Sequence, residues 1–579
     1  MQLLSYQRGS RAKVLAALLL GVMAIFVAKL FYLQIIKHSD YVAEANAEQV
    51  KPLIIPAKRG LIYAMDGSNT VPLVINQTVY TMFADPLTVT EPDKVLNVIR
   101  EVAGGNLRPH PEDLLNRRDT RYQILGTKLT REQAEKIKSQ NLRGIGFQEE
   151  SQRVYPEGSL AAQTLGFVNA AGQGQYGVEE ALNDRLTGHD GLLKSVTDVS
   201  GVPLTIGNQN INKPAQDGDN IALTIDRNIQ AYVERALAAG LKRSGATNGS
   251  VLVMDPQTGK VMAMANLPTY DPSNYGNAKD ASVFQNATIS TPYEAGSVVK
   301  SLTVSTGLDK GVITPSSTFY NKGIIRVDDT TIQNADTSEA LGTQTMQTAL
   351  TDSLNTGMVT IAERLGDDSH ITKESRDTIY NYFHDRFKLG QLTGIELAGE
   401  SPGIIIAPGS VQGNAVRYSN MVFGQGMDIT MLQMTSAFSS IINGGVYYTP
   451  TVVAGTVGGD GGLTPSDPKP FTRVVQAKTS KDIKRMLEID RHDNGAIDPA
   501  GYHVGGKTGT SQALINGRYS FTQTVGTYIG FGGDKTARYV IMVQVSGKGK
   551  NLQGAHDASP IFGNISNWML RYLKIAPKG

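Results

Sequence analysis

The hydrophobic pattern opens with an apolar run that is long enough to cross a membrane. Val14 to Ala28 is unbroken, and after Lys29 the run continues to Ile36. About 20 apolar residues span the hydrocarbon core of a bilayer. The pattern therefore predicts a transmembrane helix over residues 14–36, preceded by a short tail over residues 1–13.

Basic residues before this helix predict its orientation. Arg8, Arg11 and Lys13 precede it, which predicts a cytoplasmic N-terminus and an extracytoplasmic remainder in a single-pass protein of the cytoplasmic membrane. The alternative is a cleaved signal peptide with Ala43-Glu44-Ala45 as its cleavage site, but these residues lie far beyond the apolar run. Lys29 either snorkels to the outer interface or pairs with a partner helix.

The rest of the pattern predicts an α+β protein of two domains. Short strand-like pieces mix with polar helical pieces such as Thr130 to Asn141 as far as the turn-prone segment Gln216 to Asn220, where we place the boundary. The domains are thus 37–220 and 221–579. In the second domain we expect strands at 221–225, 250–254, 260–265, 524–531 and 539–545, and helices at 228–241 and 560–573.

Composition removes several classes of function. The net charge is +2 and the basic residues are dispersed, so no nucleic-acid partner is expected. There is no cysteine, which excludes disulfides, thiol catalysis and thiolate metal sites. We expect no cofactor and no metal.

The informative chemistry is a trio of short motifs in a fixed order. Ser297-Val298-Val299-Lys300 is followed by Ser353-Leu354-Asn355 and then by Lys507-Thr508-Gly509-Thr510. Each motif alone is weak, because Ser-x-x-Lys also occurs at Ser10 to Lys13 and Ser-x-Asn also occurs at Ser139 to Asn141. Only the motifs that begin at Ser297, Ser353 and Lys507 follow the fixed order within one compartment.

The first motif pairs a nucleophile with a base. If Ser297 opens a helix after Gly296, Lys300 lies one turn away and can reach the serine Oγ. The lysine must be neutral to accept a proton, so its pKa must be lowered by burial or by a nearby cation such as Lys507. The helix N-terminus offers the backbone N–H of Ser297 as one oxyanion donor.

The other motifs provide the walls of a cleft. Ser353 and Asn355 can shuttle a proton and hold a peptide amide. A strand over Lys507 to Thr510 suits a substrate with a terminal carboxylate. Gly501 to Thr508 also matches the nucleotide P-loop pattern, but we reject that reading because strands follow where a helix is required.

With these motifs the chain resembles the class B penicillin-binding proteins. The likeness includes further segments along nearly the whole chain: Arg59-Gly60, Asp66-Gly67, Arg153 to Pro156, Gly177 to Glu179, Leu223 to Asp226, Asp255-Pro256, Thr258-Gly259 and Phe423 to Gly426. It departs from the family at Glu294-Ala295-Gly296, where Glu-Pro-Gly is usual, and at Ala64-Met65 before Asp66-Gly67.

The resemblance implies a fold and a reaction. The expected fold is a non-catalytic pedestal followed by a transpeptidase domain, whose antiparallel sheet lies between helical clusters. The expected reaction is acylation of Ser297 by the D-Ala-D-Ala end of a peptidoglycan stem peptide, release of D-Ala, and transfer to an amine; β-lactams would acylate the same serine. Lys300 would be the base, Ser353 and Asn355 the second wall, and Lys507, Thr508, Gly509 and Thr510 the carboxylate side, with the Thr510 N–H completing the oxyanion hole.

The resemblance also implies partners. A division-specific, FtsI-like role is favoured over lateral-wall elongation, with a SEDS glycosyltransferase of the FtsW or RodA type contacting the 14–36 helix and the pedestal, and with other divisome membrane proteins. Three alternatives stay open: a Ser-His-Asp hydrolase, a β-lactamase or carboxypeptidase with the same trio, and a catalytically silent sensor or scaffold.

Overall fold

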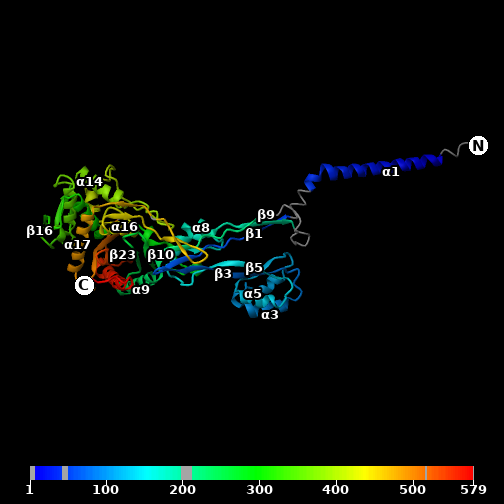
Figure 1. Ribbon diagram of the computed structural model, residues 1–579, viewed down its shortest axis with the longest axis horizontal. Helices are drawn as coiled ribbons and strands as arrows, with labels where there is room; N and C mark the ends of the chain where they lie inside the picture. The colour runs from blue at the N-terminus through cyan, green and yellow to red at the C-terminus, as the bar shows by residue number, and fades with distance from the viewer. Residues whose placement is uncertain (1–6, 42–49, 197–210, 468, 516–517, 578–579) are drawn as a thin grey trace, which may run out of the picture. The chain divides into compact units, whose positions relative to one another are not determined.

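The computed structural model describes residues 7–41, 50–196, 211–467, 469–515 and 518–577. The chain divides into two compact units (Figure 1). The first unit comprises the chain up to Arg59 together with Thr187–Gly218, and the second comprises Gly60–Leu186 together with Asp219–Gly579.

The first unit contains the apolar helix. Helix α1 (Gln7–Phe31) continues as the π-helix η1 (Tyr32–Ile36), and the span Arg11–Ile36 is predominantly apolar with no buried residue. At about 1.5 Å per residue its 26 residues extend for roughly 39 Å, enough to cross a bilayer core of about 30 Å. The unit also has a three-stranded antiparallel sheet of β1 (Val50–Ile55), β8 (Gly191–Val196) and β9 (Ile211–Lys213).

The second unit contains a seven-stranded sheet built from early and late parts of the chain. Its strand order is β19-β18-β10-β2-β3-β4, and β5 also pairs with β3. The strands are β2 (Ile62–Asp66), β3 (Asn69–Ala84), β4 (Gln123–Leu129), β5 (Ile145–Val154), β10 (Ile221–Asp226), β18 (Val453–Val457) and β19 (Leu463–Pro465). The predicted boundary at residue 220 thus lies directly before a strand that pairs with both β2 and β18, and the domain limits stay a prediction.

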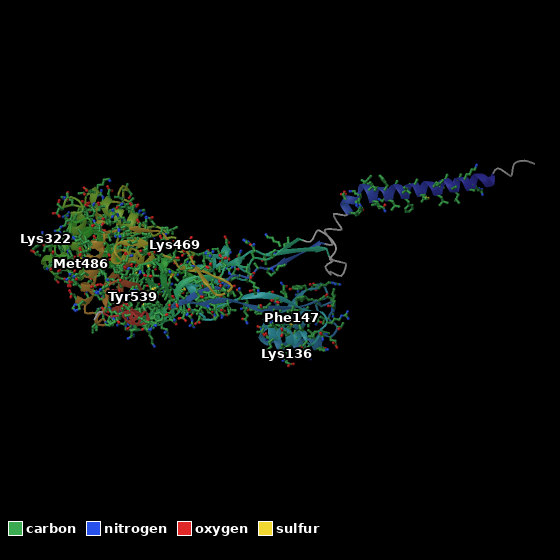
Figure 2. The ribbon with its side chains drawn as sticks, in the orientation of Figure 1. Lys136, Phe147, Lys322, Lys469, Met486 and Tyr539 are labelled. Carbon is green, nitrogen blue, oxygen red and sulfur yellow. The ribbon has the colours of Figure 1, made fainter. Side chains whose placement is uncertain are left out.

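Three helices cover the β3–β4 end of this sheet: α3 (Pro92–Ala103), α4 (Pro111–Leu115) and α5 (Arg131–Lys138). Helices α3 and α5 lie side by side there (Figure 1), and Figure 2 labels Lys136 of α5 and Phe147 of β5. Thr130 caps α5 by accepting from Gln133 N, while the Gln133 side chain accepts from Thr130 N. This capping box begins the helix that the polar pattern predicts, although the helix ends at Lys138.

Several segments behind the family resemblance meet at one buried ion pair. The guanidinium of Arg153 donates from Nε to Glu179 at 2.8 Å. It also donates to the Gly60 carbonyl at 2.7 Å and to the Asn76 side chain at 2.8 Å. These bonds join segments that are far apart in sequence. They explain why motifs dispersed along the chain occur together: their residues contact one another in the fold.

A second, five-stranded sheet forms the centre of the C-terminal region, in the antiparallel order β12-β11-β23-β22-β21. Its strands are β11 (Asn248–Met254), β12 (Val261–Leu267), β21 (His503–Ile515), β22 (Arg518–Gly533) and β23 (Ala537–Ser546). Alternate residues face opposite sides, so Val251 and Val253 join one apolar core while Leu252 and Met254 join the other.

Helices cover both faces of this sheet. Helices α9 (Arg227–Ser244) and α18 (Ser559–Tyr572) cover one face, where Tyr539 of β23, labelled in Figure 2, donates to the Ser566 carbonyl at 3.0 Å. Helices α11 (Lys300–Asp309) and α16 (Met431–Ile442) belong to the core on the other face. The α+β class, the hairpin, the two late strands and the two helices are confirmed.

The remaining elements include one long helix, α17, and many short ones. The other helices are α6 (Ala162–Leu165), α7 (Gly177–Ala181), α8 (Asn183–Thr187), α10 (Ala287–Ser290), α12 (Met346–Thr351), α13 (Asn355–Arg364), α14 (Lys373–Tyr380), α15 (Ala415–Met421), α17 (Ala477–Asp493), and the 3-10 or π segments η2 (Gly104–Asn106), η3 (Pro272–Asn277), η4 (Ala281–Phe284), η5 (Gly296–Val299), η6 (Asn381–Arg386) and η7 (Gly554–Ala558). The other strands are β6 (Phe167–Val168), β7 (Gly174–Gln175), β13 (Thr318–Asn321), β14 (Ile324–Val327), β15 (Thr330–Gln333), β16 (Gly342–Thr345), β17 (Val446–Tyr448) and β20 (Phe471–Arg473).

Candidate active site

Ser297 lies on the 3-10 turn η5, which leads directly into α11. The turn begins at Gly296, whose φ of +65° favours glycine, and a Cβ there would lie 3.0 Å from the Thr510 carbonyl oxygen. The serine is half-buried, whereas its neighbours in the turn are buried. The turn thus holds one hydroxyl at the surface beside β21.

The segment before this turn is held by hydrogen bonds, although alanine replaces the usual proline. Glu294 accepts from the Gly426 N–H at 2.6 Å and from the Tyr519 hydroxyl at 2.8 Å. The Gly296 N–H donates to the Gly424 carbonyl at 3.0 Å. These bonds fix the segment that leads to Ser297 at two neighbouring points.

The amine of Lys300 connects the first motif to the second. Its side chain is completely buried, and Nζ donates to the carbonyl and, at 3.0 Å, to the hydroxyl of Ser353. In the part of the chain that the structure describes, Lys300 bonds to Ser353 and not to the Oγ of Ser297. A neutral amine has two N–H groups and one lone pair, so these two donations leave the lone pair available.

The second motif forms the turn between α12 and α13. Ser353 has a φ of +55°, a strained value for a residue with a side chain. Asn355 begins α13 and donates from Nδ2 to the Gln333 carbonyl at 2.8 Å, which ties it to the end of β15. The turn therefore presents a hydroxyl and an amide on the same side.

The third motif is part of β21, the edge strand of the five-stranded sheet. Thr508 is half-buried and Thr510 is exposed, while Gly509 is buried. A Cβ on Gly509 would lie 2.3 Å from Thr527 Oγ1 and 3.0 Å from Val298, so the strand passes too closely for any side chain. The P-loop pattern runs into this strand, which agrees with its rejection.

One cleft of about 440 Å³ collects the three motifs. Of the sequence-predicted site residues, it is lined by Ser297, Lys300, Ser353, Asn355, Thr508, Gly509 and Thr510. Sequence reasoning gave no site role to several further lining residues: Gln333, Asn334, Ala335, Glu339, Asp352, Phe423, Gln425 and Gln512. Phe423 and Gln425 belong to a segment of the family resemblance, and Asp352 adjoins Ser353. For these three residues, the position in the sequence could have indicated a place in the cleft.

Lys507 does not line the cleft. Its side chain is completely buried, and its Nζ lies 3.4 Å from Asp490 Oδ2 of α17. Its charge can therefore act on the cleft through space, whereas its amine does not reach the cleft surface. Sequence reasoning missed Asp490, which lies 17 positions before Lys507.

Burial lowers the pKa of the lysine in the cleft and raises the pKa of two nearby carboxyl groups. Burial, followed by the positive charge of Lys507, lowers the pKa of Lys300 well below its usual value, although Asp490 opposes the shift. Burial raises the pKa of Asp490 to about 6, and Lys507 opposes that shift. Burial also raises the pKa of Asp352. A lysine that readily loses its proton thus lies one turn from a serine.

Two family models and several known proteins match this chain. Residues 249–567 match the penicillin binding protein transpeptidase domain, and residues 54–223 match the penicillin-binding protein dimerisation domain. The chain is 30% identical to penicillin-binding protein PbpB of Mycobacterium tuberculosis, over 96% of this chain and 84% of that protein. It is 29% identical to peptidoglycan D,D-transpeptidase FtsI of Escherichia coli, over 98% and 92%. The structure of penicillin binding protein 3 of M. tuberculosis complexed with aztreonam is similar, with a TM-score of 0.67 and 26% identity over 91% of this chain and 98% of that chain.

Proposed function

Because this chain belongs to the penicillin-binding protein transpeptidase family, we propose that it cross-links peptidoglycan at the division septum through an acyl-enzyme on Ser297. It is a class B penicillin-binding protein and a serine-type peptidoglycan D,D-transpeptidase. The observation that carries the residue assignment is the single cleft that all three motifs build.

The first half of the reaction forms the acyl-enzyme. Ser297 Oγ attacks the carbonyl carbon of the penultimate D-Ala, and the neutral amine of Lys300 accepts the hydroxyl proton. The backbone N–H groups of Ser297 and Thr510 stabilise the oxyanion. The C–N bond then breaks, and the released D-Ala amine takes the proton from Lys300 through the Ser353 hydroxyl. The contacts between Lys300 and Ser353 support this route.

The second half transfers the acyl group. The amine of a neighbouring stem peptide attacks the ester carbonyl, loses its proton along the same route, and restores the hydroxyl of Ser297. Asn355 would hold a substrate amide, and Thr508 and Thr510 would bind the terminal carboxylate. Gly509 lets β21 pass close to Thr527 and Val298, and the substrate backbone would lie along the free edge of this strand. Lys507 would draw the carboxylate by charge from beneath the cleft.

The septal assignment and the partners extend this proposal. It is supported by the likeness to FtsI along 98% of this chain. The apolar helix Arg11–Ile36 would anchor the protein with its N-terminus in the cytoplasm and its cleft outside. We expect an FtsW-like SEDS glycosyltransferase to contact this helix and the pedestal, together with other divisome proteins. Co-purification with an FtsW-like rather than a RodA-like protein supports the septal role, and the reverse result contradicts it.

Labelling with a fluorescent penicillin tests the chemistry. β-Lactams would acylate Ser297, as the aztreonam complex of the mycobacterial relative suggests. The full-length protein should carry one adduct on Ser297, the Ser297→Ala variant should carry none, and Ser10→Ala, in the other Ser-x-x-Lys match, should label normally. An adduct at another residue contradicts the mechanism. A long-lived adduct supports transfer, whereas rapid loss with penicillin hydrolysis indicates a β-lactamase.

A further inference from the structure

We propose that Asp490 is a positioning residue for the acylation of Ser297: it pairs with Lys507 and holds that side chain in place beneath the cleft. Asp490 and Lys507 form a buried ion pair whose members expose 2% and 1% of their side chains. The inference rests on the proposed function, because it concerns the reactivity of Ser297 through Lys507 and Lys300.

A buried ammonium group needs a counter-charge. Lys507 is buried, and an isolated cation in such a place would carry a large desolvation cost. Asp490 is the acidic residue that forms an ion pair with it in the described residues, at 3.4 Å. Helix α17 packs along β21 and supplies this carboxylate from beneath the strand. Without Asp490, the amine of the third motif would be buried without its counter-charge.

The Asp490–Lys507 contact is long, and few hydrogen bonds support it, unlike a buried ion pair that serves only to stabilise the fold. The distance of 3.4 Å is at the long limit of a hydrogen bond, and within the described residues neither Lys507 Nζ nor Asp490 Oδ2 has another hydrogen-bond partner. The other oxygen of Asp490 accepts from Asn494 Nδ2 at 3.2 Å. Asn494 also donates to the Thr351 carbonyl at 3.3 Å, next to the turn of the second motif. The carboxylate is thus fixed from one side and faces Lys507 with the other.

Groups from several elements share this field. Lys507 on β21, Lys300 on α11, Asp352 in the turn before α13 and Tyr528 on β22 all interact electrostatically with Asp490. Burial and Lys507 lower the pKa of Lys300 more than Asp490 raises it. The charge of Lys507 therefore favours a neutral Lys300, and Asp490 would act on the base by holding that charge in place.

A double-mutant cycle on the full-length protein tests this inference. The measurement is the second-order rate constant for acylation by the fluorescent penicillin. Lys507→Met should lower the constant about 1,000-fold, the upper range for loss of a single electrostatic group. Asp490→Asn should lower it about 10- to 100-fold, within the range of coupling between groups in direct contact. The double variant should equal Lys507→Met within about threefold, because the role of Asp490 disappears with its partner.

Losses that multiply in the double variant, or an Asp490→Asn variant as fast as the wild type, overturn the inference. Asp482→Asn on the same helix is the matched control and should acylate at the wild-type rate. Asp490→Glu keeps the charge and should recover most of the rate if Asp490→Asn folds poorly; a Glu variant that folds and is as slow as a folded Asn variant also contradicts the inference. If the wild type itself does not label on Ser297, the proposed function fails instead.

Discussion

Two ion pairs in the second unit are almost equally buried and yet bonded very differently. Arg153 and Glu179 expose 5% and 0% of their side chains, while Lys507 and Asp490 expose 1% and 2%. The first pair is joined at 2.8 Å, and Arg153 makes further hydrogen bonds to two distant segments. The second pair is 3.4 Å apart. Burial alone therefore does not indicate what an ion pair does.

The difference lies in where the electrostatic interaction is used. The hydrogen bonds of Arg153 link segments that are distant in sequence, so its ion pair stabilises the region around the sheet that contains β2 and β3. Lys507 has no comparable bonds, and its charge instead lowers the pKa of Lys300. Buried pairs can be neutral or unfavourable for stability, although breaking one by removing a partner is costly. We therefore expect the two pairs to respond to mutation in different measurements.

The largest effect on stability is expected from Glu179→Ala. It leaves the Arg153 guanidinium buried without its carboxylate, which should cost about 3–5 kcal/mol in the free energy of unfolding. The acylation rate of the protein that remains folded should change by less than about twofold, because the cleft lies elsewhere in the unit and distant sites act independently. Denaturant unfolding and penicillin acylation, measured on the same sample, check both parts. Unchanged stability with slow acylation would mean that the Arg153–Glu179 pair affects reactivity rather than the fold, which contradicts the proposed difference between the two pairs.

A smaller effect, of a few °C in Tm, is expected from the pH dependence of Asp490. Its pKa is raised from 3.8 to about 6 in the folded protein. A carboxyl with a raised folded pKa binds a proton more tightly when folded, so its contribution to stability is present below about pH 4 and is lost as the pH rises through about 6. The Tm of the wild type minus that of Asp490→Asn should therefore fall between pH 4 and pH 7.

Groups that titrate in both proteins cancel in this difference, and Asp482→Asn provides a control that should give a flat profile. A difference that rises with pH would mean that the pKa of Asp490 is lowered, as in an ordinary ion pair. A flat difference would mean that Asp490 is already ionised without cost. Either result would remove the contrast between the two buried pairs.

Much of this fold could be predicted from local patterns. The apolar helix, the β11–β12 hairpin and α18 follow from periodicity and turn residues, and Thr130 with Gln133 gives the start of α5. The order of the three motifs likewise pointed to the residues that line the cleft. These features depend on residues that are close in sequence, or on a motif order that is visible without coordinates.

Non-local features could not be predicted in this way. The pairing of β10 with β2 and β18 joins strands that are far apart in sequence. Asp490 was missed because α17 buries polar residues, including Arg491, at positions where periodicity expects apolar ones. The partner that makes Asp490 tolerable is on another element, so no local signal identified it.

The smallest effect is expected where an ion pair is short but exposed. Lys373 and Asp377 on α14 are 2.6 Å apart, closer than either buried pair, yet their side chains are 71% and 47% exposed. Such i,i+4 pairs contribute only about 0.3–0.5 kcal/mol, because water screens the charges and both side chains lose freedom. Asp377→Asn should therefore lower the free energy of unfolding by no more than about 0.5 kcal/mol, and the loss should shrink further in 1 M salt. A loss near that of Glu179→Ala would show that distance, rather than burial and hydrogen bonding, decides what these pairs contribute.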